Sequence, residues 1–234
     1  MEPMELFYFV LPAPSVEKSK TFFSKVFGWT DFGGPLGGHV GSTNTPCGLG
    51  GEVNEVYFCT LDLKETLAKV TAHGGTVLKE TENSVGKAAL CRDNQGTHLW
   101  FQEPGEKPEI REHAMKPKRG SAQGDLFFFS IPAPEESKAL AFYPGVLGWT
   151  FGPKGKQGGM GIENTRGPQG GLSVGNTKQF PSLWLRVDSA ADTLRRVLEA
   201  GGKGEIFEAP EGTMSECEDD QGVKFGIVQP APGF

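Results

Sequence analysis

The segment Leu6–Thr30 recurs later in the chain as Leu126–Thr150, so the same unit is present twice. Both copies contain an apolar run typical of a β-strand, a Pro-Ala-Pro turn and a helical pattern that ends at Gly-Trp-Thr. A duplication on this scale divides the 234 residues into two structural halves. The sequence therefore predicts two domains, at residues 1–105 and 124–234, joined by a polar linker at 106–123.

Each half divides again into two modules with the order strand, helix and three strands. The second module shows this most clearly, because Asp62 and Glu65 form a capping-box start for its helix and Gly74-Gly75 supplies the stop. One helix over one face of four strands makes an open, curved layer. The predicted class is α+β, with four βαβββ modules paired into two domains whose open curved sheets are mixed.

Charge and hydropathy limit the classes of partner. The formal net charge is -6 and the pI is about 5.3, whereas sequence-independent nucleic-acid binding needs a basic field. No secretory signal and no apolar stretch long enough to span a bilayer is present in this sequence. We therefore expect a cytoplasmic protein with neither a nucleic acid nor a membrane as partner.

The four cysteines show no CxxC pairing, which argues against a disulfide framework or a zinc knuckle. Cys91 and Cys217 occupy equivalent positions in the two halves, within predicted strands. This setting favours small buried hydrophobic residues over nucleophiles. The acidic residues Asp93, Asp219 and Asp220 are predicted to form turns, because Asp side chains accept hydrogen bonds from their own backbone there.

Several motifs resemble the vicinal oxygen chelate superfamily, which includes glyoxalases, bleomycin-resistance proteins and extradiol dioxygenases. Each motif is weak by itself, but their order is preserved in both halves, and the resemblance covers everything except the linker. It implies two glyoxalase-like domains built from paired modules. The matching segments are Phe22–Trp29 and Phe142–Trp149, then Leu61–Gly75 and Val187–Gly202, and finally the turns Asp93–Gly96 and Asp219–Gly222.

Metal-dependent members of the superfamily take ligands for a divalent ion from strands of each module. Carried over by position, the ligand sites fall on Phe7, Val56 and Trp100 in the first half and on Phe127, Ser182 and Gly226 in the second. These side chains do not form a ligand set, so we expect no metal and no other cofactor. A one-residue error in alignment would bring His98 or Glu52 into play, which keeps a divalent-metal site as the alternative.

What remains on the strands expected to line each curved sheet is mainly aromatic, the usual composition of a small-molecule site. The predicted ligand-binding residues are Phe7, Phe9, Phe58, Trp100, Phe127, Phe129, Trp184, Arg186 and Lys224. His98 lies two residues before Trp100, so the two side chains share a strand face, and His98 is the candidate general base or substrate hydrogen-bonder.

The sequence favours a protein that binds a small apolar or aromatic molecule in a β-sheet cup, without the usual metal site, as a monomer or homodimer. Two alternatives stay open. One is a divalent-metal-dependent lyase or dioxygenase of the same superfamily. The other is a scaffold or interaction protein whose cups are filled by its own side chains. Whether the protein is an enzyme, and for which substrate, is left open by the sequence.

Overall fold

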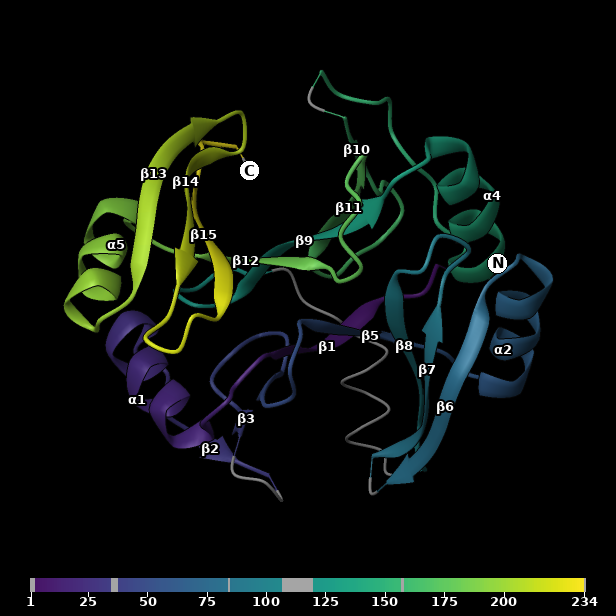
Figure 1. Cartoon of the computed structure of the whole chain (residues 1–234), viewed down its shortest axis with the longest axis horizontal. Helices are drawn as coiled ribbons and strands as arrows, with labels where there is room; N and C mark the ends of the chain where they lie inside the picture. The colour runs from purple at the N-terminus through teal and green to yellow at the C-terminus, as the bar shows by residue number, and fades with distance from the viewer. Residues whose placement is uncertain (1–2, 35–37, 84, 107–119, 157, 234) are drawn as a thin grey trace. The chain divides into compact units, whose positions relative to one another are not determined.

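The computed structural model describes residues 3–34, 38–83, 85–106, 120–156 and 158–233, so most of the predicted linker lies outside the described residues. In Figure 1 each helix is followed along the chain by a group of strands. In the first half the elements are β1 (Leu6–Leu11), α1 (Val16–Phe27), β2 (Phe32–Gly33), β3 (His39–Val40), β4 (Cys47–Leu49), β5 (Glu55–Cys59), α2 (Leu63–Ala72), β6 (Thr76–Asn83), β7 (Gly86–Arg92) and β8 (His98–Pro104).

The second half repeats this order with one shortened module. Its elements are β9 (Leu126–Ala133), α4 (Glu136–Leu147), β10 (Gly159–Gly161), β11 (Gln169–Val174), β12 (Ser182–Arg186), α5 (Ala190–Glu199), β13 (Lys203–Ala209), β14 (Gly212–Glu218) and β15 (Lys224–Pro230). After α4 the described chain forms two strands rather than three, and Phe151 and Ile162 make an isolated bridge where the extra strand was expected.

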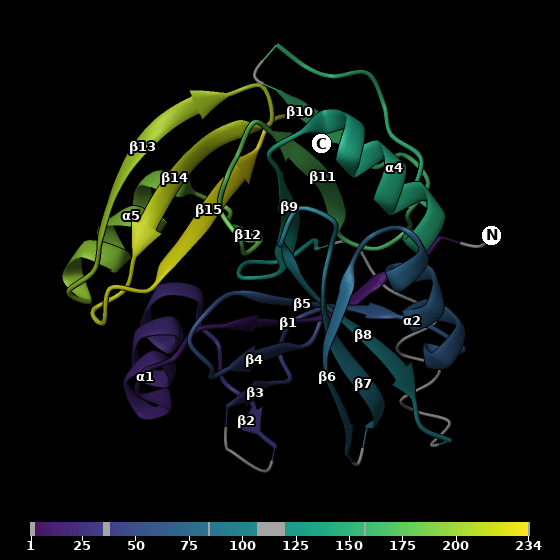
Figure 2. The ribbon, with the colours of Figure 1, turned by 45° about the vertical axis from the view of Figure 1, so that its right-hand side comes forward.

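The strands form two open mixed sheets, which confirms the predicted fold class. One sheet has eight strands in the order β2-β3-β4-β1-β5-β8-β7-β6, and the other has seven in the order β10-β11-β9-β12-β15-β14-β13. The outer three strands of the second sheet, β13, β14 and β15, are seen most clearly in Figure 2. No helix in the described part of the chain is both long and apolar enough to cross a membrane.

Helix ends follow the sequence signals. The α2 helix begins where Asp62 Oδ1 accepts a hydrogen bond from the backbone N–H of Glu65, at 2.8 Å, as the capping pattern predicted. Both α1 and α4 end at a glycine in the left-handed region, Gly28 at φ 76° and Gly148 at φ 71°. A residue with a Cβ would be strained at these two positions, which explains why Gly-Trp-Thr follows each helix.

By packing, the chain divides into two compact units that do not coincide with the halves of the sequence. The first unit contains Met1–Tyr8, Glu55–Lys118 and Phe129–Pro181; the second contains Phe9–Asn54, Arg119–Phe128 and Ser182–Phe234. In the first unit α2 lies beside α4, and in the second α1 lies beside α5 (Figure 1). The domain limits inferred from the repeat therefore stay a prediction.

Each unit is held together by the same kind of turn. In the first unit Asp93 Oδ1 accepts from the N–H groups of Gln95 and Thr97, and Gln95 Oε1 accepts from the N–H of Glu135 at the start of α4. In the second unit the same bonds are made by Asp219 and Gln221, whose partners are Gln221 N, Val223 N and Ser15 N. The prediction that Asp93 and Asp219 form turns is confirmed.

The two turns differ in one contact. In the first unit the Tyr143 hydroxyl donates to Asp93 Oδ2 at 2.7 Å, in a fully buried setting. Tyr143 is replaced by Phe23 in the other copy of the repeat, and within the described part of the chain the buried Oδ2 of Asp219 has no hydrogen-bond partner. Burial is the main reason that the pKa of Asp219 is raised. The second unit thus contains a carboxylate oxygen that lacks its donor.

Candidate functional site

Two aromatic rings face each other across neighbouring strands of the first unit. The parallel pair β5–β8 places Tyr57 directly opposite Trp100, and their rings stack with centroids 5.1 Å apart and planes 10° apart. Both side chains are half-buried, whereas the alternate residues Phe58 and Phe101 are fully buried. Successive residues of a strand point to opposite faces, so Tyr57 and Trp100 define the half-exposed face of this sheet. We call this pair the aromatic face.

The two polar groups of the aromatic face differ in their hydrogen bonding: within the described chain, the Tyr57 hydroxyl has a partner and the Trp100 indole N–H does not. The Tyr57 hydroxyl donates to Glu55 Oε2 at 2.8 Å, and burial, reinforced by the Glu55 charge, raises the pKa of Tyr57 above its usual value. Tyr57 is therefore a neutral phenol. The indole Nε1 of Trp100 is buried and has no hydrogen-bond partner among the residues that the structure describes. An unpaired buried N–H lowers the stability of the fold.

Three of the aromatic residues predicted to bind ligand lie in the core instead. Phe9, Phe58 and Phe129 are 0–1% exposed. In the first unit the Phe58 ring packs against Phe129 and Trp149 at centroid distances of 5.9 and 5.1 Å. These three side chains therefore do not line a half-exposed face. On β5 that face is carried by Tyr57, the residue before Phe58, because strand side chains alternate.

Two further aromatic residues that were predicted to bind ligand are also buried. Phe7 and Phe127 are 7% and 9% exposed. Phe7 clusters with Cys59 beside Tyr57 in the first unit, close to the aromatic face. Trp100 lies on the aromatic face itself, as described above. The residue that the sequence interpretation missed is Tyr57, although its position opposite Trp100 could have been found by counting back from the Asp62 cap.

His98 lies at the start of β8 in a defined hydrogen-bond arrangement. Its Nε2 accepts from Arg92 Nε at 2.9 Å, and its ring packs edge-on against Phe180 at 5.0 Å. Burial, followed by the Arg92 charge, lowers the pKa of His98. With Nε2 already accepting, the neutral ring carries its proton on Nδ1 and presents a donor. This geometry suits a hydrogen bond to a ligand better than proton abstraction.

Replacing Arg92 by methionine is expected to raise the pKa of His98, because it removes both a positive charge and the donor that stabilises the neutral ring. Burial persists, so a residual depression should remain. Titration of the His98 ring by NMR measures this shift. Lys87→Met on the same strand is the matched control, since Lys87 is exposed and pairs with Glu103, at the opposite end of β8 from His98. An unchanged His98 pKa in Arg92→Met would contradict the hydrogen bond from Arg92 Nε to His98 Nε2.

The second unit has an aromatic ring at the corresponding strand pair. The parallel pair β12–β15 places Trp184 opposite Gly226, and the indole covers that glycine so closely that a Cβ there would overlap the ring. Phe207 on β13, which is 43% exposed, packs edge-on against Trp184 with centroids 6.3 Å apart. Lys224, predicted as a ligand residue, is exposed and lies 3.9 Å from Glu218.

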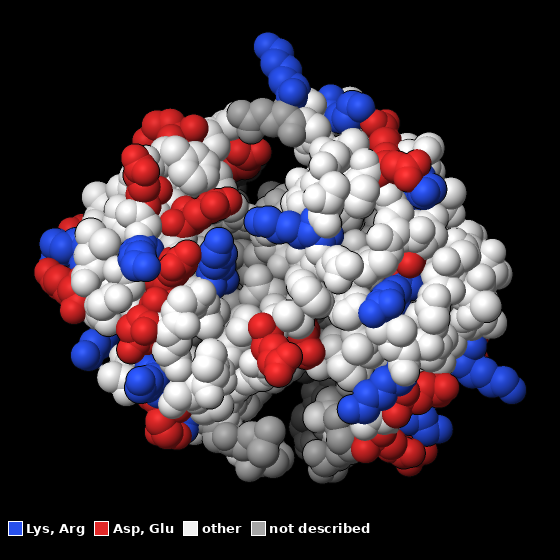
Figure 3. Space-filling model, viewed as in Figure 1, with Lys and Arg blue, Asp and Glu red and all other residues white. Residues whose placement is uncertain are grey.

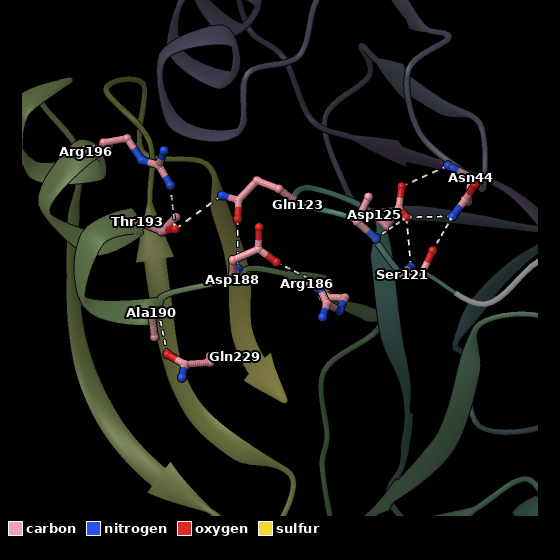
Figure 4. A network of polar contacts seen from close by, with 11 residues as sticks. Asn44, Ser121, Gln123, Asp125, Arg186, Asp188, Ala190, Thr193, Arg196 and Gln229 are labelled. Atoms are coloured by element: carbon pink, nitrogen blue, oxygen red, sulfur yellow. Dashed lines mark hydrogen bonds and ion pairs between the residues drawn. The ribbon is translucent and has the colours of Figure 1, made fainter. Parts of the chain in front are cut away.

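Arg186 shares the strand face of Trp184, two residues along β12. Its Nη1 donates to Asp188 Oδ1 at 2.9 Å, and the N–H of Asp188 donates to Gln123 Oε1. The backbone of Arg186 is fixed on both sides, since its N–H donates to Asp125 O and its C=O accepts from Gly124 N. Figure 4 shows this network, with the Arg186 guanidinium extending from the strand.

The cysteines lie in the core, as predicted. Cys47, Cys91 and Cys217 are free and buried, and burial is the main cause that raises the pKa of each thiol. A raised thiol pKa leaves little thiolate at neutral pH and so disfavours nucleophilic chemistry.

Comparison with known proteins reveals the fold family. No protein-family model and no curated protein matches the chain. Among solved structures, the 2,3-dioxygenase LapB from Pseudomonas sp. KL28 matches 100% of this chain and 96% of its own at 14% identity, with a TM-score of 0.65. A Mn(II)-bound glyoxalase from Novosphingobium aromaticivorans matches 97% of this chain and 82% of its own at 12% identity, with a TM-score of 0.63.

A third match is homoprotocatechuate 2,3-dioxygenase from Brevibacterium fuscum, in complex with 3,4-dihydroxyphenylacetate, with 14% identity over 98% of this chain and 82% of its own and a TM-score of 0.60. These proteins share one architecture along the full length of the chain. The chain has the vicinal oxygen chelate fold. At such low identities the similarity extends to the fold and leaves the chemistry to the residues of each site.

The strand pairs onto which the resemblance carried metal ligands do not present a ligand set on their half-exposed faces. These faces hold Tyr57 and Trp100 in the first unit and Trp184, opposite Gly226, in the second. The Tyr57 hydroxyl is the only side-chain oxygen among these four residues, and it is a neutral phenol bound to Glu55. Divalent ions take imidazole, carboxylate or thiolate ligands.

Elsewhere, the described residues contain no group of three His, Cys, Asp or Glu side chains placed to hold an ion. The expected absence of a metal cofactor remains a prediction. Val56, on which one of the carried-over ligand positions fell, is fully buried, and the next residue, Tyr57, is half-buried.

Proposed function

We propose that this protein binds a small planar, apolar or aromatic molecule on the aromatic face of Tyr57 and Trp100, without a divalent metal. The stacked pair supports this proposal, since it offers a flat apolar surface on a half-exposed strand face. A planar ligand that stacks on these rings would gain contact with them. His98, on the same face of β8, supplies a hydrogen-bond donor through Nδ1.

The distribution of charged side chains on the protein surface is compatible with a neutral ligand. Figure 3 shows acidic and basic side chains intermingled on the face drawn, so no broad field of one sign selects a highly charged partner. The structural neighbours named above are dioxygenases and a glyoxalase, and one of them is in complex with a small aromatic molecule. The ligand of that neighbour supports the proposal of a small aromatic ligand for this chain.

Calorimetric titration with 2-naphthamide, a neutral planar probe, tests the proposal. We expect saturable binding that Trp100→Leu weakens about tenfold or more, because stacking on a ring contributes about 1–3 kcal/mol by analogy with base stacking. Trp100→Phe is the matched control and should retain most of the affinity, since it keeps a ring at this position. Binding that Trp100→Leu leaves unchanged, or no binding of planar probes at all, would refute the proposed site.

A further inference from the structure

An arginine held by a histidine lies at one end of the aromatic face. Antiparallel pairing of β7 with β8 places Arg92 opposite His98, and the hydrogen bond from Arg92 Nε to His98 Nε2, at 2.9 Å, joins their side chains on one face of the sheet. Trp100 lies on the same face, two residues along β8 and about 7 Å from His98 between Cα atoms. The guanidinium group is therefore anchored beside the aromatic face.

The Arg92 guanidinium has hydrogen-bond donors available for a ligand. Arg92 is exposed, and within the described chain it forms no ion pair with an acid. Because Nε is bound to His98, both Nη groups remain, and they can give a carboxylate two parallel hydrogen bonds. His98 is itself fixed, since its ring packs against Phe180 and its backbone N–H donates to Gln179 O.

The acidic groups nearest to Arg92 do not neutralise it. Asp93 is buried, and its carboxylate is occupied by the turn bonds described above. Glu80 lies opposite Ala89, so its side chain is on the other face of the sheet. Glu55 shares the face of Arg92, but β5 is two strands from β7, about 10 Å across, which exceeds the screening length of about 8 Å at physiological salt.

The matching strand ends of the second unit carry a pair of opposite charges. Glu218 and Lys224 lie opposite each other on β14 and β15, where the first unit has Arg92 and His98, and their charged groups are 3.9 Å apart. An arginine without an acidic partner among the described residues is thus present in one copy only. We infer that the aromatic face prefers planar aromatic carboxylates, with the carboxylate on the Nη groups of Arg92 and the ring against Trp100.

This inference rests on the proposal that the aromatic face binds planar molecules, and its test separates the two. Calorimetric titration of the full chain compares 2-naphthoate with 2-naphthamide, which has the same ring system and no charge. We expect naphthoate to bind about fivefold more tightly, the upper range for an ion pair at a solvent-exposed arginine. Trp100→Leu should weaken the binding of both probes, because both would stack on that ring.

Charge substitutions at Arg92 test the anchor itself. Arg92→Met should abolish the preference for naphthoate. Arg92→Glu introduces the acid that Glu218 provides in the second unit and should reverse the preference, because the carboxylate of the probe would meet a like charge. Lys87→Met is the matched control and should leave the preference intact, since Lys87 is an exposed cation at the opposite end of β7.

The possible outcomes distinguish the anchor from the aromatic face. Equal affinity for the two probes, or a preference that survives Arg92→Met, would overturn the carboxylate anchor, whereas Trp100-dependent binding of naphthamide would still support the proposed function. Naphthoate binding that Trp100→Leu leaves unchanged would contradict the placement of the ring. Failure of both probes to bind would overturn both proposals.

Discussion

Replacing Phe58 by alanine is expected to lower the free energy of unfolding by about 3–5 kcal/mol, the usual cost of removing a buried aromatic ring. Phe58 is fully buried and its ring contacts Phe101, Phe129 and Trp149, so truncation leaves a cavity that rigid neighbours cannot fill. Denaturant unfolding followed by circular dichroism and by tryptophan fluorescence measures the change.

The matched comparison is Trp100→Leu, which removes a half-buried ring from the opposite face of the same sheet. This substitution should lower the free energy of unfolding by only about 1 kcal/mol, since it removes one stacked pair and a side chain that is only partly buried. The two substitutions then separate stability from binding: Phe58→Ala destabilises the protein, and Trp100→Leu weakens ligand binding. Similar stability losses for both would contradict the assignment of Phe58 to the core and of Trp100 to the half-exposed face.

The second large effect concerns the two buried turns. Tyr143→Phe removes the hydroxyl that donates to Asp93 Oδ2 and should cost about 1.5–3 kcal/mol, the range for hydrogen bonds to charged groups. The reciprocal change, Phe23→Tyr, introduces a hydroxyl where Asp219 Oδ2 lacks a partner and should stabilise the second unit by about 1 kcal/mol. The two substitutions should therefore change the free energy of unfolding in opposite directions. A loss of stability in Phe23→Tyr would contradict the equivalence of the two turns.

The effect of Phe23→Tyr on the free energy of unfolding should depend on pH in a defined direction. Burial raises the pKa of Asp219 in the folded protein, so the fold favours the neutral carboxyl. The corresponding stability is fully present below the unfolded pKa of about 4 and is lost as the pH rises through the raised folded value. The hydroxyl introduced by Phe23→Tyr would donate to the ionised carboxylate and lower the pKa of Asp219. The stabilisation by Phe23→Tyr should therefore grow as the pH increases from about 3 to about 7.

Much of the fold could be predicted from the repeat. The framework signals are local: Asp62 caps α2, Gly28 and Gly148 end α1 and α4, and Asp93 and Asp219 form turns through their own backbone. Such signals depend on a few neighbouring residues, so they can be identified without knowledge of tertiary packing. The missing strand after α4 was not predictable in the same way, because the glycine-rich stretch there carries no alternating pattern.

The site was harder to predict because it depends on strand register. Side chains alternate with a period of two, so a one-residue error exchanges the buried and the half-exposed face. That error placed Val56 and Phe58 on the half-exposed face of β5, whereas both are buried and Tyr57 lies on that face. Composition does not reveal the error, since both faces of these strands are aromatic. For Trp100 the strand face could be predicted, because the preceding turn fixes its distance from Gly96.

The central claim is that this protein binds a planar molecule on the aromatic face of Tyr57 and Trp100 without a divalent metal. Elemental analysis of protein purified without chelators, paired with 2-naphthamide affinity before and after treatment with EDTA, tests it most directly. We predict far less than one transition-metal ion per chain and an affinity that EDTA does not change. One equivalent of manganese, iron, nickel or zinc per chain, removed by EDTA together with binding, would contradict the account.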